Sequence, residues 1–283
     1  MPWSAVIGSP INHSLSPTIH RAAWKSLGID NTWNYYALEQ TADTLPSFIS
    51  TLDADCVGLS ITMPCKHAVM QHLDAIDPLA EAVGAVNTVI PAGGILTGFN
   101  TDVHGMSSAL VESLKTQGLP LPQRALVLGS GATASSALAA LGTLGATDIT
   151  VAARRFGGPY SVVTAAHRLG LSIHQVMWQR TQDVLRAIER ADIVLSTLPA
   201  GVADELAPHV MPRAEQTLLD VVYAPRITAL VKHWSDHNGN IAWGSEMLLH
   251  QAALQVRLMT GREPDIAPMR HALMSIREGE NSS

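Results

Sequence analysis

A glycine-rich turn in the middle of the chain constrains the fold more than any other feature. Residues 125–129 form an apolar run that ends at Gly129, and residues 129–134 read G-x-G-x-x-A before an alanine-rich helical segment at 135–144. The first glycine of such a pattern permits a tight turn. The second, Gly131, lets the backbone approach a pyrophosphate at the amino terminus of the helix. The pattern therefore predicts a strand–turn–helix unit that binds a dinucleotide.

Two arginines follow the next predicted strand and indicate which dinucleotide is bound. The strand covers residues 148–152 and leads into Ala153, Arg154 and Arg155. An NAD site carries an acidic residue about 20 residues past the glycines, where it holds the ribose 2′-hydroxyl. Guanidinium groups instead pair with a 2′-phosphate through charge-assisted hydrogen bonds. We therefore expect NADP; the alternative interpretation is a solvated arginine pair on a turn.

The rest of the chain alternates short apolar runs with helical patterns, which is typical of an α/β fold with a largely parallel sheet. We expect strands at 4–8 and 56–62, a hairpin formed by 85–90 and 95–99, and a helix at 17–27 capped by Ser16. A polar stretch with a glycine and two prolines at 115–124 marks a domain junction. A length of 283 residues suits two domains.

Composition excludes several functional classes. The net charge of −6 provides no basic face, so we expect neither nucleic acid nor a membrane as partner. No apolar run is long enough for a transmembrane helix, and the first residues do not resemble a signal peptide. The two cysteines, Cys56 and Cys65, fit neither a disulfide framework nor a zinc pattern. We expect a cytoplasmic protein with no metal.

Polar residues gather where the predicted strands of the first hundred residues end, which is where ligands bind in such sheets. These residues are Ser14, Ser16, Thr62, Lys66, Asn87, Asn100 and Asp102. Lys66 and Asp102 could form an acid–base pair in which each keeps the other ionised. From the residues alone, two ordinary surface charges remain the alternative.

Several motifs, taken in order, resemble those of the shikimate dehydrogenase family. They are S-L-S-P at 14–17, I-T-M-P-C-K at 61–66, G-A-V-N-T at 84–88, N-T-D at 100–102, the glycine turn, D-V-V-Y at 220–223, and Gly244 followed by Met247, Leu248 and Gln251. The resemblance implies NADPH-dependent reduction of 3-dehydroshikimate to shikimate. It also implies a substrate-binding α/β domain at 1–103, a Rossmann-type NADP domain at 104–243, and C-terminal helices at 244–283 that return to the first domain.

The resemblance implies a role for individual residues. Lys66 would be the catalytic acid or base, with Asp102 as its partner. Ser14, Ser16 and Tyr223 would bind the substrate carboxylate, and Thr62, Asn87 and Gln251 its ring hydroxyls. The cofactor set would be Gly129, Ser130, Gly131, Ala132, Thr133, Ala153, Arg154, Arg155, Val221 and Gly244.

The chain also departs from the family pattern. Ser60 stands where asparagine is common, Phe99 replaces a polar residue, and residues 198–201 lack the common polar loop. Two rival functions follow: an NAD-dependent quinate/shikimate dehydrogenase, and a non-catalytic NADP-binding regulator. The regulator would be expected to lose Lys66 or Asp102, and both are present. The expected partner is a small-molecule substrate, and the expected assembly is a monomer or homodimer.

Overall fold

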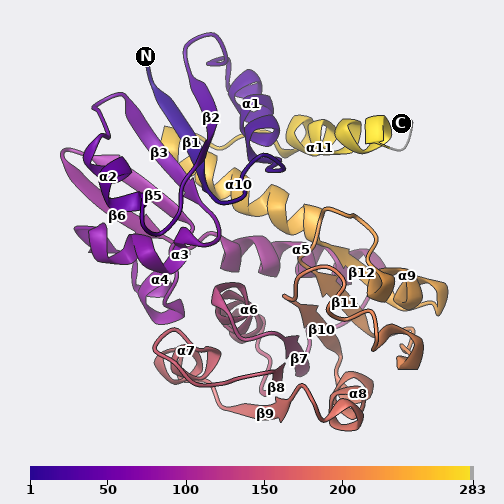
Figure 1. Ribbon diagram of the computed structural model, residues 1–283. Helices are drawn as coiled ribbons and strands as arrows, with labels where there is room; N and C mark the ends of the chain where they lie inside the picture. Colours follow the sequence, from indigo (N-terminus) through magenta and orange to yellow (C-terminus); the bar gives the residue numbers. More distant parts are fainter. Residues whose placement is uncertain (281–283) are drawn as a thin grey trace. The chain divides into compact units, whose positions relative to one another are not determined.

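The computed structural model describes residues 1–280 and divides into two compact units (Figure 1). The first unit contains Met1–Thr101 and the chain from Leu249 onward, and the second contains Asp102–Leu248. Each unit has its own six-stranded sheet with helices packed against it. The predicted α/β class is confirmed.

The sheet of the first unit is mixed, in the order β2-β1-β3-β5-β6-β4. Its strands are β1 (Trp3–Gly8), β2 (Asn34–Glu39), β3 (Cys56–Ile61), β4 (Ala75–Ile76), β5 (Thr88–Ala92) and β6 (Ile95–Phe99). Strand β1 pairs in parallel with β2 and β3, whereas β5 is antiparallel to both β3 and β6. The strands expected at 4–8 and 56–62 and the expected hairpin are therefore present.

The hairpin differs from the prediction in the bounds of its first strand. Strand β5 begins at Thr88 rather than at residue 85, and it continues through Pro91 to Ala92. Residues 85–87 serve other partners: the Val86 amide donates to the Lys66 carbonyl over 3.0 Å. The turn is therefore only Gly93 and Gly94, whose φ angles of 59° and 81° suit glycine.

The helices of the first unit begin with α1 (Ser16–Leu27), which has Pro17 in its first turn and ends at Gly28 with φ 70°. The prediction that Ser16 caps this helix is wrong. Leu15 holds the cap position, and the Ser16 amide donates to the Ser14 hydroxyl over 3.3 Å. Ser14 therefore satisfies the first of the α1 amides, which have no partner within the helix.

The remaining helical segments of this unit include two from the end of the chain. They are α2 (Leu45–Ser50), α3 (Cys65–Ala68), η1 (Val69–His72), α4 (Pro78–Val83), the later part of α10 (Gly244–Thr260), and α11 (Ile266–Glu280). Helix α11 packs against α1, so the C-terminal segment returns to the first unit as expected (Figure 1).

The sheet of the second unit is entirely parallel, in the order β12-β11-β10-β7-β8-β9. Its strands are β7 (Arg124–Leu128), β8 (Asp148–Ala153), β9 (Ile173–Met177), β10 (Ile193–Ser196), β11 (Thr217–Asp220) and β12 (Asn240–Trp243). Numbered from β7, this is the 3-2-1-4-5-6 order of a Rossmann fold. Its helical segments are α5 (Asp102–Gln117), α6 (Ala132–Thr143), α7 (Val162–Arg168), α8 (Thr181–Arg190), η2 (Ala207–His209) and α9 (Ala229–Asp236).

The central strands of this sheet are apolar along most of their length, because helices cover both faces of a parallel sheet. All residues of β10 are buried, and so are Leu126 and Leu128 of β7. The strand order reverses between β7 and β10, so the connections that leave their carboxyl ends run to opposite faces. This is the point where open α/β sheets bind ligands.

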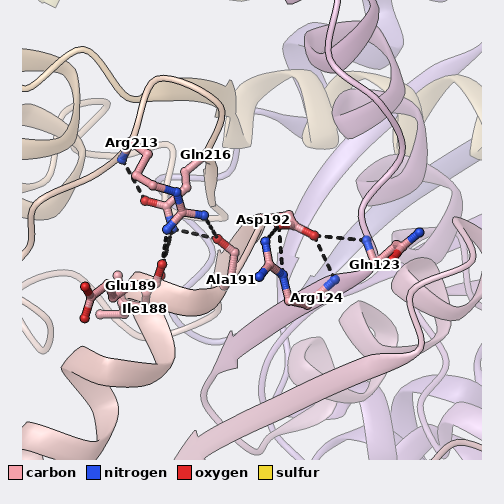
Figure 2. Close-up of polar contacts among 8 residues, drawn as sticks. All are labelled: Gln123, Arg124, Ile188, Glu189, Ala191, Asp192, Arg213 and Gln216. Carbon is pink, nitrogen blue, oxygen red and sulfur yellow. Dashed lines mark hydrogen bonds and ion pairs between the residues drawn. The ribbon is translucent and has the colours of Figure 1, made fainter.

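Hydrogen bonds to main-chain atoms fix the amino-terminal edge of the same sheet (Figure 2). Asp192, which precedes β10, accepts from the amides of Gln123 and Arg124 and from the Arg124 guanidinium over 2.6 Å. The pKa of Asp192 is lowered because these donors outweigh the opposing effect of burial on the carboxyl group. These contacts hold β7 and β10 in register.

The buried side chain of Gln216 forms hydrogen bonds with the carboxyl end of α8 (Figure 2). The Gln216 side-chain amide donates to the carbonyls of Ile188 (2.8 Å), Glu189 (3.3 Å) and Ala191 (2.6 Å). Its oxygen accepts from the Arg213 amide over 2.8 Å. Carbonyls at a helix end have no partner within the helix, so Gln216 acts as a side-chain cap.

No helix among residues 1–280 is both long enough and apolar enough to cross a membrane.

Candidate functional site

The glycine turn lies at the reversal point of the second unit's sheet. Gly129 has φ 121°, and a Cβ added to it would lie 2.3 Å from the Thr197 hydroxyl oxygen. That hydroxyl donates to the Leu128 carbonyl over 2.8 Å, which ties the end of β10 to the end of β7. Both the backbone angle and the close approach of Thr197 therefore require glycine at position 129.

Gly131 caps α6, which begins at Ala132, three residues earlier than predicted. Within residues 1–280, no atom beyond the immediate chain neighbours of Gly131 lies within 4 Å of the position that a Cβ there would occupy. The first amides of a helix have no partner within the helix and carry partial positive charge, so they favour an anion. The open approach to Gly131 and the start of α6 together form the arrangement that accepts a pyrophosphate.

The predicted arginine pair lies directly beyond the next strand. Ala153 is the last residue of β8 and is buried, while Arg154 and Arg155 are both exposed. The Ala153 carbonyl accepts from the Trp178 amide over 2.9 Å, which fixes the backbone where the arginines begin. The turn after β8 thus presents two guanidinium groups to solvent beside the β7 turn.

Gly244 lies against the end of β11. A Cβ at Gly244 would lie 2.4 Å from the Asp220 carbonyl oxygen and 2.9 Å from Val221, so no side chain fits there. Asp220 accepts from the Thr228 hydroxyl over 2.8 Å, and burial raises the pKa of its carboxyl group. Tyr223 follows on the same segment, and burial raises the pKa of its phenol.

Thr62 and Lys66 lie at the carboxyl end of β3 in the first unit. The Thr62 amide donates to the Ile7 carbonyl over 2.9 Å, and a Cβ at Gly8 would lie 2.4 Å from the Thr62 methyl group. Lys66 is half-buried on the short helix α3, and its carbonyl accepts from Val86. These main-chain contacts place Lys66 beside the segment that carries Asn87.

A cluster of buried amides and hydroxyls surrounds Asn87. Its side-chain nitrogen lies 2.9 Å from the Thr101 hydroxyl and 3.3 Å from the Gln251 side-chain oxygen, and its side-chain oxygen accepts from the Thr101 amide over 2.7 Å. Asn87, Thr101 and Gln251 are 2%, 1% and 6% exposed. Asn100 is also buried, and its side chain donates to the Ala85 carbonyl over 2.9 Å.

The structure therefore brings some predicted residues together within each unit. Asn87 meets Gln251, and Ser14 meets Ser16, in the first unit. In the second unit the glycine turn and Val221 both follow central strands of one sheet, and Gly244 packs on Val221. Asp102 directly follows Thr101 and begins α5, and Tyr223 belongs with Asp102 to the second unit.

Sequence reasoning missed Thr101 and Gln255, which are both buried and hydrogen-bonded within the Asn87 cluster. Gln255 had a detectable signal, because it lies four residues after Gln251 and so shares its face of α10. A polar residue on the buried face of a helix needs a partner, which makes it a candidate for a buried network.

Comparison with known proteins gives matches along nearly the whole chain. The Shikimate dehydrogenase substrate binding domain matches residues 6–89, and the Shikimate 5'-dehydrogenase C-terminal domain matches residues 244–274. Shikimate dehydrogenase (NADP(+)) of Thermus thermophilus is 35% identical over 271 residues, which cover 95% of this chain and 96% of that protein.

Solved structures agree with this match. The crystal structure of Mycobacterium tuberculosis shikimate dehydrogenase superposes with a TM-score of 0.85 at 35% identity, covering 98% of this chain and 100% of that chain. Shikimate 5-dehydrogenase from Thermus thermophilus, solved in complex with NADP(H) and shikimate, gives a TM-score of 0.80 at 32% identity and covers 97% of this chain and 99% of that chain.

The Rossmann sheet with its glycine turn, and the separate unit with a buried polar cluster, define a two-domain enzyme of the dinucleotide-dependent oxidoreductase class. The chain belongs to the shikimate dehydrogenase family.

Proposed function

We propose that the chain reduces the ketone of 3-dehydroshikimate to the alcohol of shikimate with NADPH, in a reversible reaction. The observation that carries the proposal is the conjunction in one chain of two features. A glycine turn lies at the β7–β10 reversal point, and a buried amide pair, Asn87 and Gln251, lies in the unit that matches a substrate-binding domain.

The first unit would supply most of the residues that bind the substrate, and the second unit would supply Tyr223. Ser14 and Ser16 lie at the start of α1, where hydroxyls and main-chain amides favour a carboxylate, and Tyr223 would contribute its phenol. Thr62, Asn87 and Gln251 would bind ring hydroxyls. A buried amide both donates and accepts, so a pair of them recognises hydroxyls and rejects an analogue that lacks them.

Lys66 and Asp102 would carry the proton transfer. As hydride reaches the ring ketone, a cationic lysine donates a proton to the developing alkoxide and stabilises its charge, which accelerates the reaction because this charge forms only in the transition state. Asp102 would hydrogen-bond to Lys66 and keep it charged. The half-buried position of Lys66 suits this role, because desolvation strengthens each electrostatic contact.

The second unit would bind NADP. The pyrophosphate would lie over Gly129, Ser130, Gly131, Ala132 and Thr133 at the start of α6. The 2′-phosphate would pair with Arg154 and Arg155 beyond Ala153. Val221 and Gly244 would lie beside the nicotinamide; their close packing leaves no room for a side chain at 244. The reduced cofactor supplies the hydride.

An absorbance assay at 340 nm, with shikimate and quinate each tested against NADP and NAD, tests the proposal directly. The expected result is turnover of shikimate with NADP and much weaker turnover in the other three combinations. Preference for quinate and NAD would overturn the proposal in favour of a quinate-type dehydrogenase. Binding of NADP without any turnover would indicate a non-catalytic regulator.

We further propose a cytoplasmic protein that is a monomer or homodimer. Both cysteines are buried and free, which suits a reducing compartment. Light scattering coupled to size-exclusion chromatography measures the oligomeric state.

A further inference from the structure

A continuous chain of hydrogen bonds runs beneath the Asn87 cluster in the first unit. The Tyr35 hydroxyl donates to the Ser60 hydroxyl over 2.6 Å, and Ser60 donates to the Gln255 side-chain oxygen over 2.8 Å. The Gln255 nitrogen donates to the Thr88 hydroxyl over 2.9 Å and to the Asn87 carbonyl over 3.1 Å. All five residues are at most 4% exposed. The chain joins β2, β3, β5 and α10.

Main-chain groups fix the direction of this chain. The Asn87 carbonyl can only accept, so the Gln255 atom that faces it must be the nitrogen. The Gln255 oxygen then faces Ser60, which must donate its single proton to it, and Tyr35 must donate to Ser60. Thr88 accepts from Gln255, and its own proton is donated to the Asn87 side-chain oxygen over 2.9 Å.

A second main-chain group fixes the Asn87 side chain itself. The Thr101 amide can only donate, and it lies 2.7 Å from the Asn87 side-chain atom that also accepts from Thr88, so this atom is the oxygen. The Asn87 amino group therefore points to the Thr101 hydroxyl and the Gln251 oxygen. The Thr101 amide and the Thr88 hydroxyl together thus hold the Asn87 side chain in one orientation.

The hydrogen-bond chain also contacts the first turns of α1 through Tyr35. The His20 ring stacks on Tyr35, with centroids 4.1 Å apart and planes inclined by 20°. The His20 Nδ1 lies 2.8 Å from the Ser16 carbonyl, so it carries the proton and donates. Burial lowers the pKa of His20 to about 4, so the ring is neutral near neutral pH; the Ser16 carbonyl and the Gln255 side chain partly oppose this shift. Ser16 and Asn87, which would bind different groups of the substrate, thus rest on one buried framework.

We propose that Gln255 is a positioning residue for substrate binding, which acts through Asn87 and Thr88 and is supported by Ser60 and Tyr35. It holds the Thr88 hydroxyl toward the Asn87 side-chain oxygen, which supports the orientation set by the Thr101 amide, and touches no reacting atom. This inference rests on the proposed function, because it assumes that Asn87 binds a ring hydroxyl. Loss of Gln255 frees the Thr88 hydroxyl to rotate and leaves the Thr101 amide to orient Asn87 alone, so the substrate meets a less firmly fixed Asn87.

The test measures KM and kcat for shikimate and NADP in Gln255→Met, which keeps the length of the side chain and removes its hydrogen bonds. We expect the KM for shikimate to rise roughly tenfold, the effect of one lost hydrogen bond in a buried site, with the KM for NADP unchanged. Gln216→Met is the matched control, because it removes an equally buried glutamine from the second unit. It should leave both KM values unchanged.

Two gentler variants keep the inference testable where Gln255→Met fails to fold. Ser60→Ala and Tyr35→Phe each remove one hydroxyl from the chain, and both should raise the KM for shikimate about two- to fivefold in the same direction. An active wild type with an unchanged shikimate KM in these variants would overturn the inference alone. An equal rise in the KM for NADP would do the same. A wild type that does not oxidise shikimate would overturn the proposed function, and the inference with it.

Discussion

Gln216 and Gln255 are both glutamines and are equally buried, yet their hydrogen-bond partners are of different kinds. Gln216 in the second unit has main-chain partners: three carbonyls at the end of α8 and the Arg213 amide. Gln255 in the first unit bonds one carbonyl and two side chains, Ser60 and Thr88. Burial alone therefore does not reveal what a buried amide does.

The type of hydrogen-bond partner determines whether the loss of a buried glutamine affects the substrate site. Main-chain partners are fixed by the fold, so losing Gln216 affects the free energy of unfolding and nothing further. The Thr88 hydroxyl can rotate, so losing Gln255 weakens the hydrogen bond that Thr88 donates to the Asn87 side chain. The comparison extends to the two sheets: β10 is apolar until its last residue, whereas β3 and β5 contain Ser60 and Thr88 within the buried sheet.

The largest expected effect tests the proposed catalytic pair, Lys66 of the first unit and Asp102, the first residue of the second unit. Lys66→Ala should lower kcat by about 10²- to 10⁴-fold, the usual range for a lost general acid, with Asp102→Ala showing a similar loss. Steady-state kinetics with shikimate and NADP measures it. Lys25→Ala, which removes an exposed lysine of the same unit, is the control and should match the wild type. A Lys66→Ala variant with normal kcat and a raised KM would make Lys66 a binding residue.

The next prediction concerns His20 and the stability of the first unit's framework. The folded chain keeps this imidazole neutral down to a pKa of about 4, whereas the unfolded chain takes up the proton near 6.5. Protons therefore favour the unfolded chain between these values. The stability that the neutral His20 ring contributes is therefore constant above pH 6.5. It decreases as the pH falls toward 4, by about 3 kcal/mol in total for a fully buried group.

Urea unfolding of the wild type and His20→Phe across pH 4 to 7.5 isolates this effect. The wild type should lose more stability than the variant as the pH falls, because phenylalanine does not titrate. His174→Gln changes an exposed histidine of the second unit and should retain the wild-type slope. Parallel curves for wild type and His20→Phe would show that His20 is not held neutral by burial.

A third prediction distinguishes Gln216 from Gln255 by the effect of its loss on the free energy of unfolding. Gln216→Met should lower the free energy of unfolding by about 2 kcal/mol, because carbonyls at the end of α8 lose a buried partner. Chemical unfolding measures this directly. A raised shikimate KM in a folded Gln216→Met variant would break the comparison, since it would show that main-chain partners also transmit to the site.

Local patterns predicted the glycine turn of the second unit well, because its strand, turn and helix are contiguous in the chain. The strand, the glycine turn and the start of α6 occupy adjacent residues, and the next strand leads directly into Arg154. The first unit was predicted less fully. Ser60 and Gln255 are 195 positions apart, and no local pattern indicates that they touch.

Two local errors have the same origin. Ser16 was predicted to cap α1 from residue preference, but the Ser14 hydroxyl accepts from the Ser16 amide instead. Residues 85–87 have strand composition, but their main-chain groups include bonds to Lys66 and Phe99 before β5 begins. In both places a hydrogen-bond partner, either a neighbouring residue or one more distant in the sequence, determines which of two possible local structures forms. The resemblance pointed to Ser60 only as a departure, and the structure shows its hydroxyl accepting from Tyr35 and donating to Gln255.

The smallest expected effect concerns cofactor choice and belongs to the second unit. Arg154 and Arg155 are exposed, so the contacts proposed for them with a 2′-phosphate would be partly screened by water. A charge-assisted hydrogen bond contributes about 1.5–3 kcal/mol, and the lower end of this range corresponds to roughly tenfold in binding. Arg154→Ala should therefore raise the KM for NADP about tenfold and leave the KM for shikimate unchanged.

The kinetics with each cofactor decide this prediction. NAD carries a hydroxyl where NADP carries the phosphate, so weak turnover with NAD should be the same in wild type and Arg154→Ala. Added salt should weaken NADP binding more than NAD binding, because only the phosphate contact is ionic. Arg190→Ala removes an exposed arginine of α8 and is the matched control. Equal kcat/KM for NADP and NAD in the wild type would contradict the assignment. A rise in shikimate KM with Arg154→Ala would instead mean that the turn after β8 also affects substrate binding, which is proposed for Tyr223 alone among the residues beyond Asp102 in the second unit.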